Sequence, residues 1–564
     1  MLNELAVEKT EKKIYDILPH EPETIAMALL VIGMGAYYLW RMFAITPQYD
    51  ELYTYYTFIS KGPFYAAIHW PLPNNHVGYS VLSGFVDYFG NSYFGLRGVS
   101  FVCAISNLIL VYRICKRFFS HGLPFAAALL YASMQVVNEY SVQGRGYTLA
   151  TLCFLLSIYC ICQICSLGEK RMYLYFSLFG VIVLGLYTVP SSVYWVVPVG
   201  LSGALYLLIN AVRSKSVYDK PSDNIYRKKL INLVFSGLFA AAGTTFLYSV
   251  IWLAIGSNLL VKTSGSEFFG WTHGAVLLRS PMKALLTGID YMLSQPYIQS
   301  LEPDVFWQRY LGWNYSMLNY MLPGMVIVLI IFILAGMGCM IYECIKHFEY
   351  SRTVINLVAI VNLLFIGVML ILQKKLPYLR VFGYSSFIVV LCVCSVFERL
   401  INVHIRIYNR KISGLSGENA SSKENEIISR EGKWYFGLGV YIPTICIAVL
   451  FLLRVTSSDF NCQLGHRENE LFNTLYIADV TKKNNPAVLD CDQQYLMKFG
   501  WDIDCTKTDV DGADMVIVDK DMLQSGYSGE DFWKFYQTHE TINWDYLKSM
   551  RVIYESEDFI LYVK

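Results

Sequence analysis

Two adjacent acidic residues, Asp50 and Glu51, follow the first long apolar segment of the chain. A carboxylate at a membrane surface can act as a general base and take the proton from a hydroxyl or amine, which chemistry on a lipid-linked substrate would need. Two acids at this place could instead only complement the dipole at the start of a helix. The polar turn that follows favours chemistry, with Asp50 as the base and Glu51 as its partner or a metal ligand.

A turn rich in proline and asparagine leads from these acids to the next apolar segment, and residues 69–76 read His-Trp-Pro-Leu-Pro-Asn-Asn-His. The aromatic run before the turn suits a helix whose rings lie in the headgroup region of a membrane. Amides and imidazoles held there could bind a lipid-linked substrate. We therefore expect Trp70, Asn75 and His76 to contact the substrate.

Histidines in the same turn raise the question of a metal site. His69 and His76 could bind a divalent cation together with Asp50 and the more distant His273. They lack a tight ligand spacing, however, and interfacial histidines are more often hydrogen-bonded residues than metal ligands. We therefore predict no definite cofactor and leave a divalent metal on Asp50, His69 and His76 as an open alternative.

A second group of charges lies in the short loop 138–146. Arg145 offers planar donors that suit a phosphate, and Glu139 could be a second catalytic acid. The alternative is a pair of solvated loop charges or an internal salt bridge.

Three cations, Lys374, Lys375 and Arg380, lie in a later loop that we place outside the cytoplasm. They break the positive-inside tendency, and binding a donor phosphate would explain them. Contact with anionic lipid headgroups is the alternative. We expect Arg380, and then Lys375, to bind the substrate.

The elements that position these residues are membrane helices. With 564 residues, 55% of them hydrophobic, and a mean hydropathy of +0.39, the chain is predicted to be a polytopic α-helical membrane protein. No basic domain is present, and we expect no nucleic-acid partner. Segments of about 20 mostly apolar residues mark about eleven transmembrane helices: 24–45, 94–112, 123–137, 147–167, 174–190, 194–212, 230–255, 325–345, 354–372, 382–400 and 434–453.

The apolar segment Val77–Phe89 is too short for a good span and carries Asp87. As a helix lying at the interface, it leaves the clusters of lysine and arginine on the cytoplasmic side. The predicted domains are a cytoplasmic N-terminus (1–23), a transmembrane domain (24–453) with external loops 46–93 and 256–323, and an extracytoplasmic tail (454–564). Residues 412–433 read as a flexible linker.

The tail is predicted to be a small α/β domain. Residues 487–490 and 513–518 suit buried strands, 529–537 a helix, and 550–555 with 558–563 a closing hairpin. A bond between Cys491 and Cys505 is compatible with the spacing but is not established by it.

With this topology, the chain resembles the GT-C superfamily of integral membrane glycosyltransferases, whose members include protein O-mannosyltransferases and lipid A aminoarabinose transferases. The resemblance covers residues 24–400. It implies a polyprenyl-phosphate-sugar donor, a GT-C-like fold and a substrate-binding role for Tyr147. The motifs that carry it are Asp50-Glu51, residues 70–79, Arg97 and Gln143-Gly144-Arg145-Gly146-Tyr147.

The predicted function is therefore transfer of a sugar from a polyprenyl-phosphate donor in the membrane to an extracytoplasmic glycan, lipid or protein in the cell envelope. A multi-span lipid or glycan transporter or flippase is the alternative. Transporters place ionisable groups near the midplane of the membrane, whereas these spans are almost free of charge. A non-catalytic scaffold for the tail would leave the paired acids unexplained.

Overall fold

A computed structural model of the chain describes most of its residues. The described ranges are 21–70, 74–166, 171–214, 223–255, 286, 298, 300–348, 350–415, 422–457, 466–523 and 535–564.

The chain forms two compact units, and each is discontinuous in sequence. The first comprises Met1–Tyr38, Phe101–Ser141 and Gly146–Phe460. The second comprises Leu39–Ser100, Val142–Arg145 and Asn461–Lys564. The loop that carries Asp50 therefore groups with the C-terminal tail.

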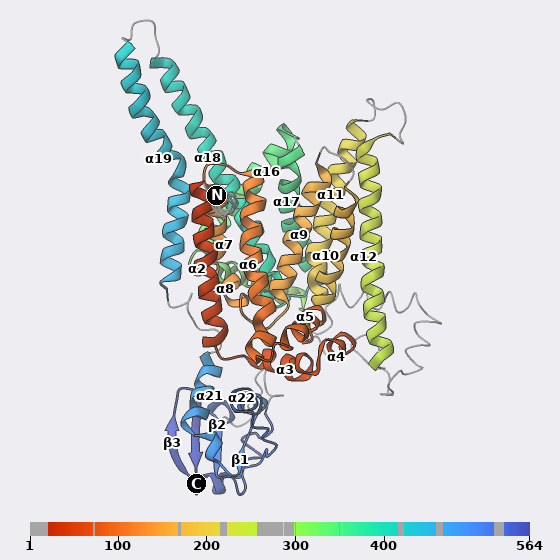
Figure 1. Ribbon diagram of the computed structural model, residues 1–564, viewed down its shortest axis with the longest axis vertical. Coiled ribbons are helices and arrows are strands. Elements are labelled where there is room, and N and C mark those ends of the chain that lie inside the picture. The colour runs from red at the N-terminus through yellow and green to blue at the C-terminus, as the bar shows by residue number, and fades with distance from the viewer. Residues whose placement is uncertain are drawn as a thin grey trace, which may run out of the picture. The chain divides into compact units, whose positions relative to one another are not determined.

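Every predicted transmembrane segment coincides with helix, and the predicted polytopic helical fold is confirmed (Figure 1). Among the described residues, eight helical segments are long and apolar enough to cross a membrane. Shorter apolar helices cover Leu123–Ala132, Met172–Thr188 and Gly439–Val455. The helices are α2 (Pro22–Ala44), α6 (Ser92–Phe118), α7 (Leu123–Ala132), α8 (Gln135–Tyr140), α9 (Tyr147–Cys165), α10 (Met172–Thr188), α11 (Val193–Arg213), α12 (Ile225–Ile255), α15 (Pro303–Met321), α16 (Val326–Lys346), α17 (Tyr350–Gln373), α18 (Ser386–Leu415) and α19 (Ser422–Val455).

Two predictions about these helices need correction. The segment 123–137 is not one helix, because the chain leaves helical geometry at Met134 (φ −77°, ψ 132°) and α8 follows α7 as a separate helix. The described parts of the segment 412–433 are helical, since α18 runs to Leu415 and α19 begins at Ser422, and residues 416–421 lie outside the described ranges. Its glutamates, lysines and isoleucines do not break a helix, and charge alone wrongly suggested a linker.

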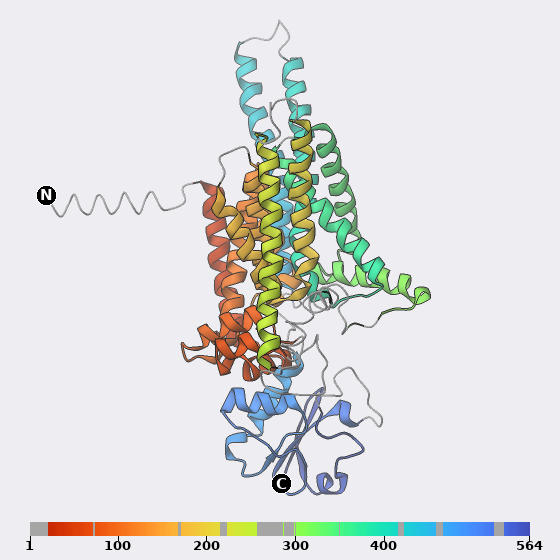
Figure 2. The same ribbon diagram turned by 90° about the vertical axis from the view of Figure 1, so that its right-hand side faces the viewer.

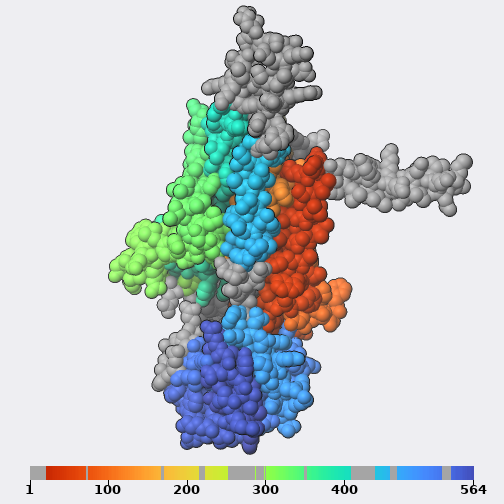
Figure 3. All heavy atoms as spheres, turned by 90° about the vertical axis from the view of Figure 1, so that its left-hand side faces the viewer, coloured from red at the N-terminus to blue at the C-terminus, as the bar shows by residue number. Residues whose placement is uncertain are grey.

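Large apolar side chains remain exposed on the outer faces of several helices. Figure 3 shows one face of the molecule on which α2, α16 and α19 reach the surface. The exposed side chains on these helices include Leu29, Ile32, Ile327, Ile331, Ile442 and Ile445. Contact with lipid chains explains these faces, because lipid is as apolar as the side chains themselves.

The second unit contains short helices after α2 and the whole tail. Helix α5 (Val77–Asp87) has 11 residues and rises about 16 Å, which is short of the roughly 30 Å apolar thickness of a bilayer. This length agrees with a helix that does not cross the membrane. The other elements are α3 (Tyr49–Thr57), α4 (Pro63–Ile68), α21 (His466–Ile477), α22 (Cys491–Trp501), α23 (Trp544–Lys548), β1 (Pro486–Ala487), β2 (Met515–Asp519), β3 (Arg551–Glu555) and β4 (Phe559–Val563).

The strands form one sheet in the order β1-β2-β4-β3 (Figure 2). β1 and β2 are parallel, and the other pairs are antiparallel. Alternate residues of β2 enter separate cores, since Met515 and Ile517 pack in one and Val516 and Val518 in the other. The predicted small α/β tail and its closing hairpin are confirmed.

Other predictions for the tail have mixed outcomes. Cys491 and Cys505 are not joined in a disulfide. Of the predicted helix 529–537, residues up to 534 lie outside the described ranges, and Phe535 forms a β-bridge with Asp490 instead.

Candidate functional site

Glu51 is fully buried and accepts hydrogen bonds on both carboxylate oxygens. Arg97 donates to it in a bidentate pair, with Nε–Oε1 and Nη2–Oε2 distances of 2.8 Å. The backbone N–H groups of Gly144 (2.6 Å) and Gln48 (2.9 Å) also donate to it. With 0% of its side chain exposed, Glu51 cannot reach a substrate. The geometry favours a positioning role for Glu51.

Arg97, the partner of Glu51, also binds the end of helix α2. Its Nη1 donates to the carbonyl oxygens of Met42 (3.0 Å) and Ile45 (2.6 Å). Carbonyls at a helix C-terminus lack partners within the helix and need outside donors. The pair of Arg97 and Glu51 therefore joins the end of α2, the start of α3 and the loop at Gly144.

Asp50 is the accessible member of the acidic pair, because 31% of its side chain is exposed. Its Oδ1 accepts a hydrogen bond from Asn74 Nδ2 at 2.9 Å. Its Oδ2 lies 3.6 Å from Arg145 Nη2. Two neighbours thus hold the carboxylate in place, while part of it can meet an incoming group.

Asn74 and Thr54 complete this cluster, and our sequence analysis did not select them. Arg145 Nη1 donates to Asn74 Oδ1 at 2.7 Å, and the Thr54 hydroxyl donates to the same oxygen at 2.8 Å. Asn74 therefore connects Arg145 to Asp50. A helical spacing of four residues from Asp50 could have indicated Thr54, but nothing in the pattern separates Asn74 from Asn75.

The turn residues expected to bind substrate are buried. Asn75 Nδ2 donates to the carbonyls of His69 (2.5 Å) and Ala66 (3.3 Å), and its Oδ1 accepts from Ser80 (2.6 Å). Trp70 and His76 are only 2% and 4% exposed. These contacts shape the turn that presents Asn74.

Asp50, His69 and His76 do not come together as metal ligands, and His273 lies outside the described residues. His69 stacks on Tyr65 with ring centroids 3.6 Å apart, and its Nδ1 lies 2.8 Å from the Tyr65 carbonyl oxygen. Among the described residues, the three-residue group with ligand atoms close enough for a metal is His466, Glu470 and Glu557, not Asp50, His69 and His76. A divalent metal at Asp50 is therefore not supported.

The remaining candidates lie in the first unit. Tyr320 of α15 hydrogen-bonds to Glu139 and Tyr140. Burial is the largest cause that raises the pKa of the Tyr320 hydroxyl, and the interactions with Tyr140 and Glu139 raise it further. The hydroxyl therefore stays protonated and donates to Glu139, which is half-buried. The geometry gives Glu139 a partner within the fold.

Tyr147 and Arg380 line one small cavity with Ser191, Ser192 and Trp195. Both residues are half-buried, and the Arg380 guanidinium lies 4.6 Å from the ring centre of Tyr378. Lys375 is half-buried in the same loop. The structure therefore brings Tyr147 and Arg380, two of the predicted substrate-binding residues, to the same cavity.

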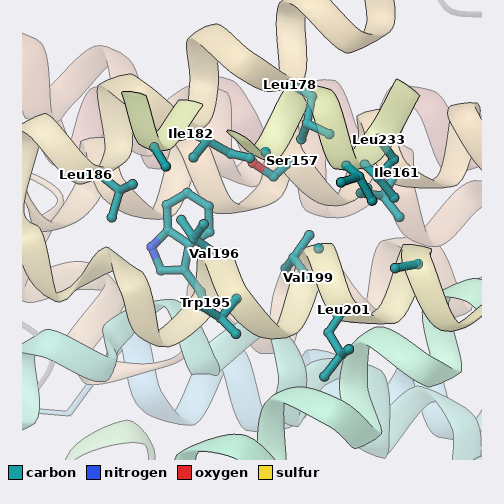
Figure 4. A pocket seen from close by; sticks show the side chains of 16 residues that line it. Ser157, Ile161, Leu178, Ile182, Leu186, Trp195, Val196, Val199, Leu201 and Leu233 are labelled. Atoms are coloured by element: carbon teal, nitrogen blue, oxygen red, sulfur yellow. The ribbon is translucent and has the colours of Figure 1, made fainter. Parts of the chain in front are cut away.

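A larger apolar cavity of about 380 Å³ lies among α9, α10, α11 and α12 (Figure 4). Its walls are aliphatic side chains with one indole and one hydroxyl. Trp195 lines this cavity as well as the small cavity with Arg380. The labelled lining residues are Ser157, Ile161, Leu178, Ile182, Leu186, Trp195, Val196, Val199, Leu201 and Leu233.

The family model described as dolichyl-phosphate-mannose-protein mannosyltransferase matches residues 76–221. The match confirms the resemblance to protein O-mannosyltransferases over a segment that includes Arg97 and Arg145. Together with the long apolar helices, it supports an integral membrane protein.

Two solved structures are similar to this chain. ArnT from Cupriavidus metallidurans in the apo state has 9% identity and a TM-score of 0.47, covering 95% of this chain and 97% of its own. The Archaeoglobus fulgidus oligosaccharyltransferase tethered to an acceptor peptide has 12% identity and a TM-score of 0.41, covering 79% of this chain. The match spans 57% of that oligosaccharyltransferase. No curated protein matches the sequence.

Proposed function

We propose that this protein is a membrane glycosyltransferase that moves a sugar from a polyprenyl-phosphate donor to an extracytoplasmic acceptor, with Asp50 as the general base. The observation that carries this proposal is the difference in access between the two adjacent acids. Glu51 has 0% and Asp50 31% of its side chain exposed. Only Asp50 can meet an acceptor, and Asn74 and Arg145 hold it in one orientation.

In the proposed reaction, Asp50 takes the proton from the acceptor hydroxyl or amine as that atom attacks the anomeric carbon of the sugar. The bond between this carbon and the phosphate oxygen breaks. The polyprenyl phosphate leaves with the electron pair. Asn74, which donates to Asp50 Oδ1, keeps the carboxylate aligned for the proton transfer.

Recognition of the donor phosphate is assigned to Arg380 and Tyr147, with Lys375 adding positive charge. Arg145 was an equal candidate, but it is only 5% exposed and donates to Asn74 and Thr54. Its part in the proposal is to hold the cluster around Asp50. The apolar cavity that shares Trp195 with the Arg380 cavity suits a polyprenyl chain.

The proposed orientation has the N-terminus in the cytoplasm and the tail outside it. The distribution of lysine and arginine supports this orientation. In this orientation the loop with Asp50 and the loop with Arg380 are each extracytoplasmic.

The deciding experiment compares Asp50→Asn with the wild-type protein and with Asp545→Asn. Asp545 is a matched control because it is a tail aspartate with 97% of its side chain exposed. Transfer is followed as release of farnesyl phosphate from a panel of farnesyl-phosphate sugars, with a membrane extract as the acceptor. We expect Asp50→Asn to lower turnover about 10²–10⁴-fold and the control to leave it unchanged.

Binding of farnesyl phosphate and the melting temperature should not change in Asp50→Asn. Arg380→Ala should weaken farnesyl phosphate binding, and Arg380→Lys should restore only part of it, because an ammonium group lacks the guanidinium fork. Near-normal turnover in Asp50→Asn would show that Asp50 is not the base.

A further inference from the structure

Helix α3 has two faces with different partners. Tyr49, Leu52, Tyr53 and Tyr56 recur at a spacing of three and four residues and share one face. Asp50, Glu51 and Thr54 lie on the opposite face, and they bind the arginine and asparagine side chains described above. Packing contacts made by the first face therefore hold the helix that carries Asp50.

The aromatic face of α3 packs against helix α22 of the tail (Figure 1). Tyr495 contacts three tyrosines of α3: its ring is stacked on that of Tyr56 (5.8 Å, 8°) and lies 5.9 Å from Tyr49 and 6.5 Å from Tyr53. This packing differs from the expected position of the rings among lipid headgroups. Helix α22, which is more than 430 residues away in sequence, supplies the partner.

Phe499, one turn further along α22, packs edge-on against two more rings. One belongs to Tyr55 of α3 (6.0 Å, 85°) and the other to Tyr93 at the start of α6 (4.9 Å, 76°). Lys498, between these two α22 residues, places its ammonium 5.2 Å from the ring centre of Tyr56. Three residues of α22, namely Tyr495, Lys498 and Phe499, therefore contact aromatic rings in this region.

The tail also encloses the apolar residue on this face of α3. Leu52 is 1% exposed and packs in the same core cluster as Leu496 and Leu475 of the tail. Just before α3, the backbone N–H of Thr46 donates to Asn469 Oδ1 at 3.0 Å. The tail therefore holds both the helix and the chain that leads into it.

We propose that helix α22 positions Asp50 by fixing α3, with Tyr495 and Phe499 as positioning residues. The catalytic part of this proposal rests on the proposed function. Helix α3 has nine residues, and isolated helices shorter than about 12–15 residues are marginal in water. Asp50 lies in the first turn of α3, where a helix that loses its packing partner frays first. The tail is then a required part of the active site.

The test uses the full-length protein in detergent and the double variant Tyr495→Ala/Phe499→Ala. Tyr546→Ala is the matched control, because Tyr546 packs in the other core of the tail and its hydroxyl donates to the Ala513 carbonyl. The conservative variant Tyr495→Phe keeps the stacked ring. Hydrogen exchange of the amides in 49–57 reports on α3, and transfer from farnesyl-phosphate sugars reports on Asp50.

We expect the protection factors of the α3 amides to fall at least tenfold in the double variant. Its turnover should fall roughly 10- to 100-fold, because small misplacements of a catalytic group cost about this much. Its KM for the farnesyl-phosphate sugar should stay within about twofold, since misplacing the base lowers kcat without removing donor contacts. Tyr495→Phe and Tyr546→Ala should resemble the wild type in both measurements.

Unchanged hydrogen exchange of α3 in the double variant would overturn the proposal. An equal loss of exchange protection in Tyr546→Ala would also overturn it, because it would indicate general unfolding of the tail. Lost protection with normal turnover would show that α22 packs on α3 without positioning the base. Failure of the proposed function is distinguishable, because it would appear as normal turnover in Asp50→Asn whatever happens to α3.

Discussion

Asp50 and Glu51 are adjacent residues of helix α3, and each pairs with an arginine from elsewhere in the chain. The surroundings of the two pairs differ sharply. Glu51 and Arg97 form a bidentate pair at 2.8 Å, with neither side chain exposed. Asp50 lies 3.6 Å from Arg145 and keeps 31% of its side chain exposed. Consecutive residues of an α-helix point about 100° apart, so one acid enters the interior and the other faces outward. Adjacent acids of similar chemistry can therefore have unrelated roles.

The buried pair is costly to break but does not by itself imply stability. Removing charges from water is unfavourable, and the attraction of the pair repays this cost only when the other donors and acceptors are satisfied. Here the amides of Gly144 and Gln48 donate to Glu51, and the carbonyls of Met42, in α2, and Ile45, just after it, accept from Arg97. The Asp50 carboxylate lies farther from its arginine, at 3.6 Å against 2.8 Å in the buried pair, and 31% of its side chain is exposed.

The largest expected effect follows from breaking the buried pair. Arg97→Ala leaves the Glu51 charge buried without its main partner, and we expect the free energy of unfolding to fall by about 3–5 kcal/mol. Asp50→Ala removes a carboxylate that is 31% exposed and 3.6 Å from Arg145, so we expect a smaller loss than for Arg97→Ala. Denaturant titration of both variants in detergent measures the difference. Equal losses would show that burial does not distinguish the two pairs.

A smaller effect is expected at Gly144, whose amide donates to Glu51. An added Cβ would lie 2.6 Å from the Leu96 side chain and 3.0 Å from its carbonyl oxygen. Gly144→Ala should therefore push the amide away from Glu51 and destabilise the fold by about 1–3 kcal/mol. Gly180→Ala is the control, because nothing lies within 4 Å of an added Cβ there. Similar melting temperatures for the two variants would contradict the close approach.

The smallest effect concerns Asp87, a third carboxylate of the same unit, which is paired with a neutral group. Tyr55 donates to its Oδ1 at 3.0 Å, and burial, which outweighs this bond, raises the pKa of Asp87 above its ordinary value of 3.8. The folded state thus holds the proton more tightly than the unfolded state, and this contribution to stability is lost as the pH rises through the raised pKa. The change of stability with pH has the opposite sign to that caused by a carboxylate that an arginine stabilises.

Asp87→Asn should remove this contribution to the pH dependence and change the free energy of unfolding at neutral pH by no more than about 0.5 kcal/mol. The measurement compares melting temperatures of the variant and the wild type from about pH 4 upward. Relative to the wild type, the variant should gain stability as the pH rises. A gain as the pH falls would mean that the Tyr55 hydrogen bond outweighs burial.

The sequence predicted some of this site and missed the rest for identifiable reasons. Asp50 was selected because it follows an apolar segment and precedes a polar turn, and both signals are local. Asn75 was selected in place of Asn74 because neighbouring asparagines in one turn are equivalent until their side chains have partners. Ser80 and two backbone carbonyls engage Asn75, whereas Asp50, Thr54 and Arg145 engage Asn74.

The sequence by itself determined the membrane helices and the strands of the tail. Twenty apolar residues in succession, or a short apolar run bounded by turn residues, select their structure through local hydrophobicity and hydrogen bonding. Those signals need no knowledge of distant contacts.

Only the tertiary structure decided which acid is buried and what covers the aromatic face of α3. The partners of Glu51 lie 46 and 93 residues away at Arg97 and Gly144, and the hydrogen bond from Thr46 to Asn469 spans 423 residues. Burial of a charge depends on whether such distant donors arrive, because an unpaired charge would stay in water. Local sequence does not specify this, since both acids are equally ready to accept a partner.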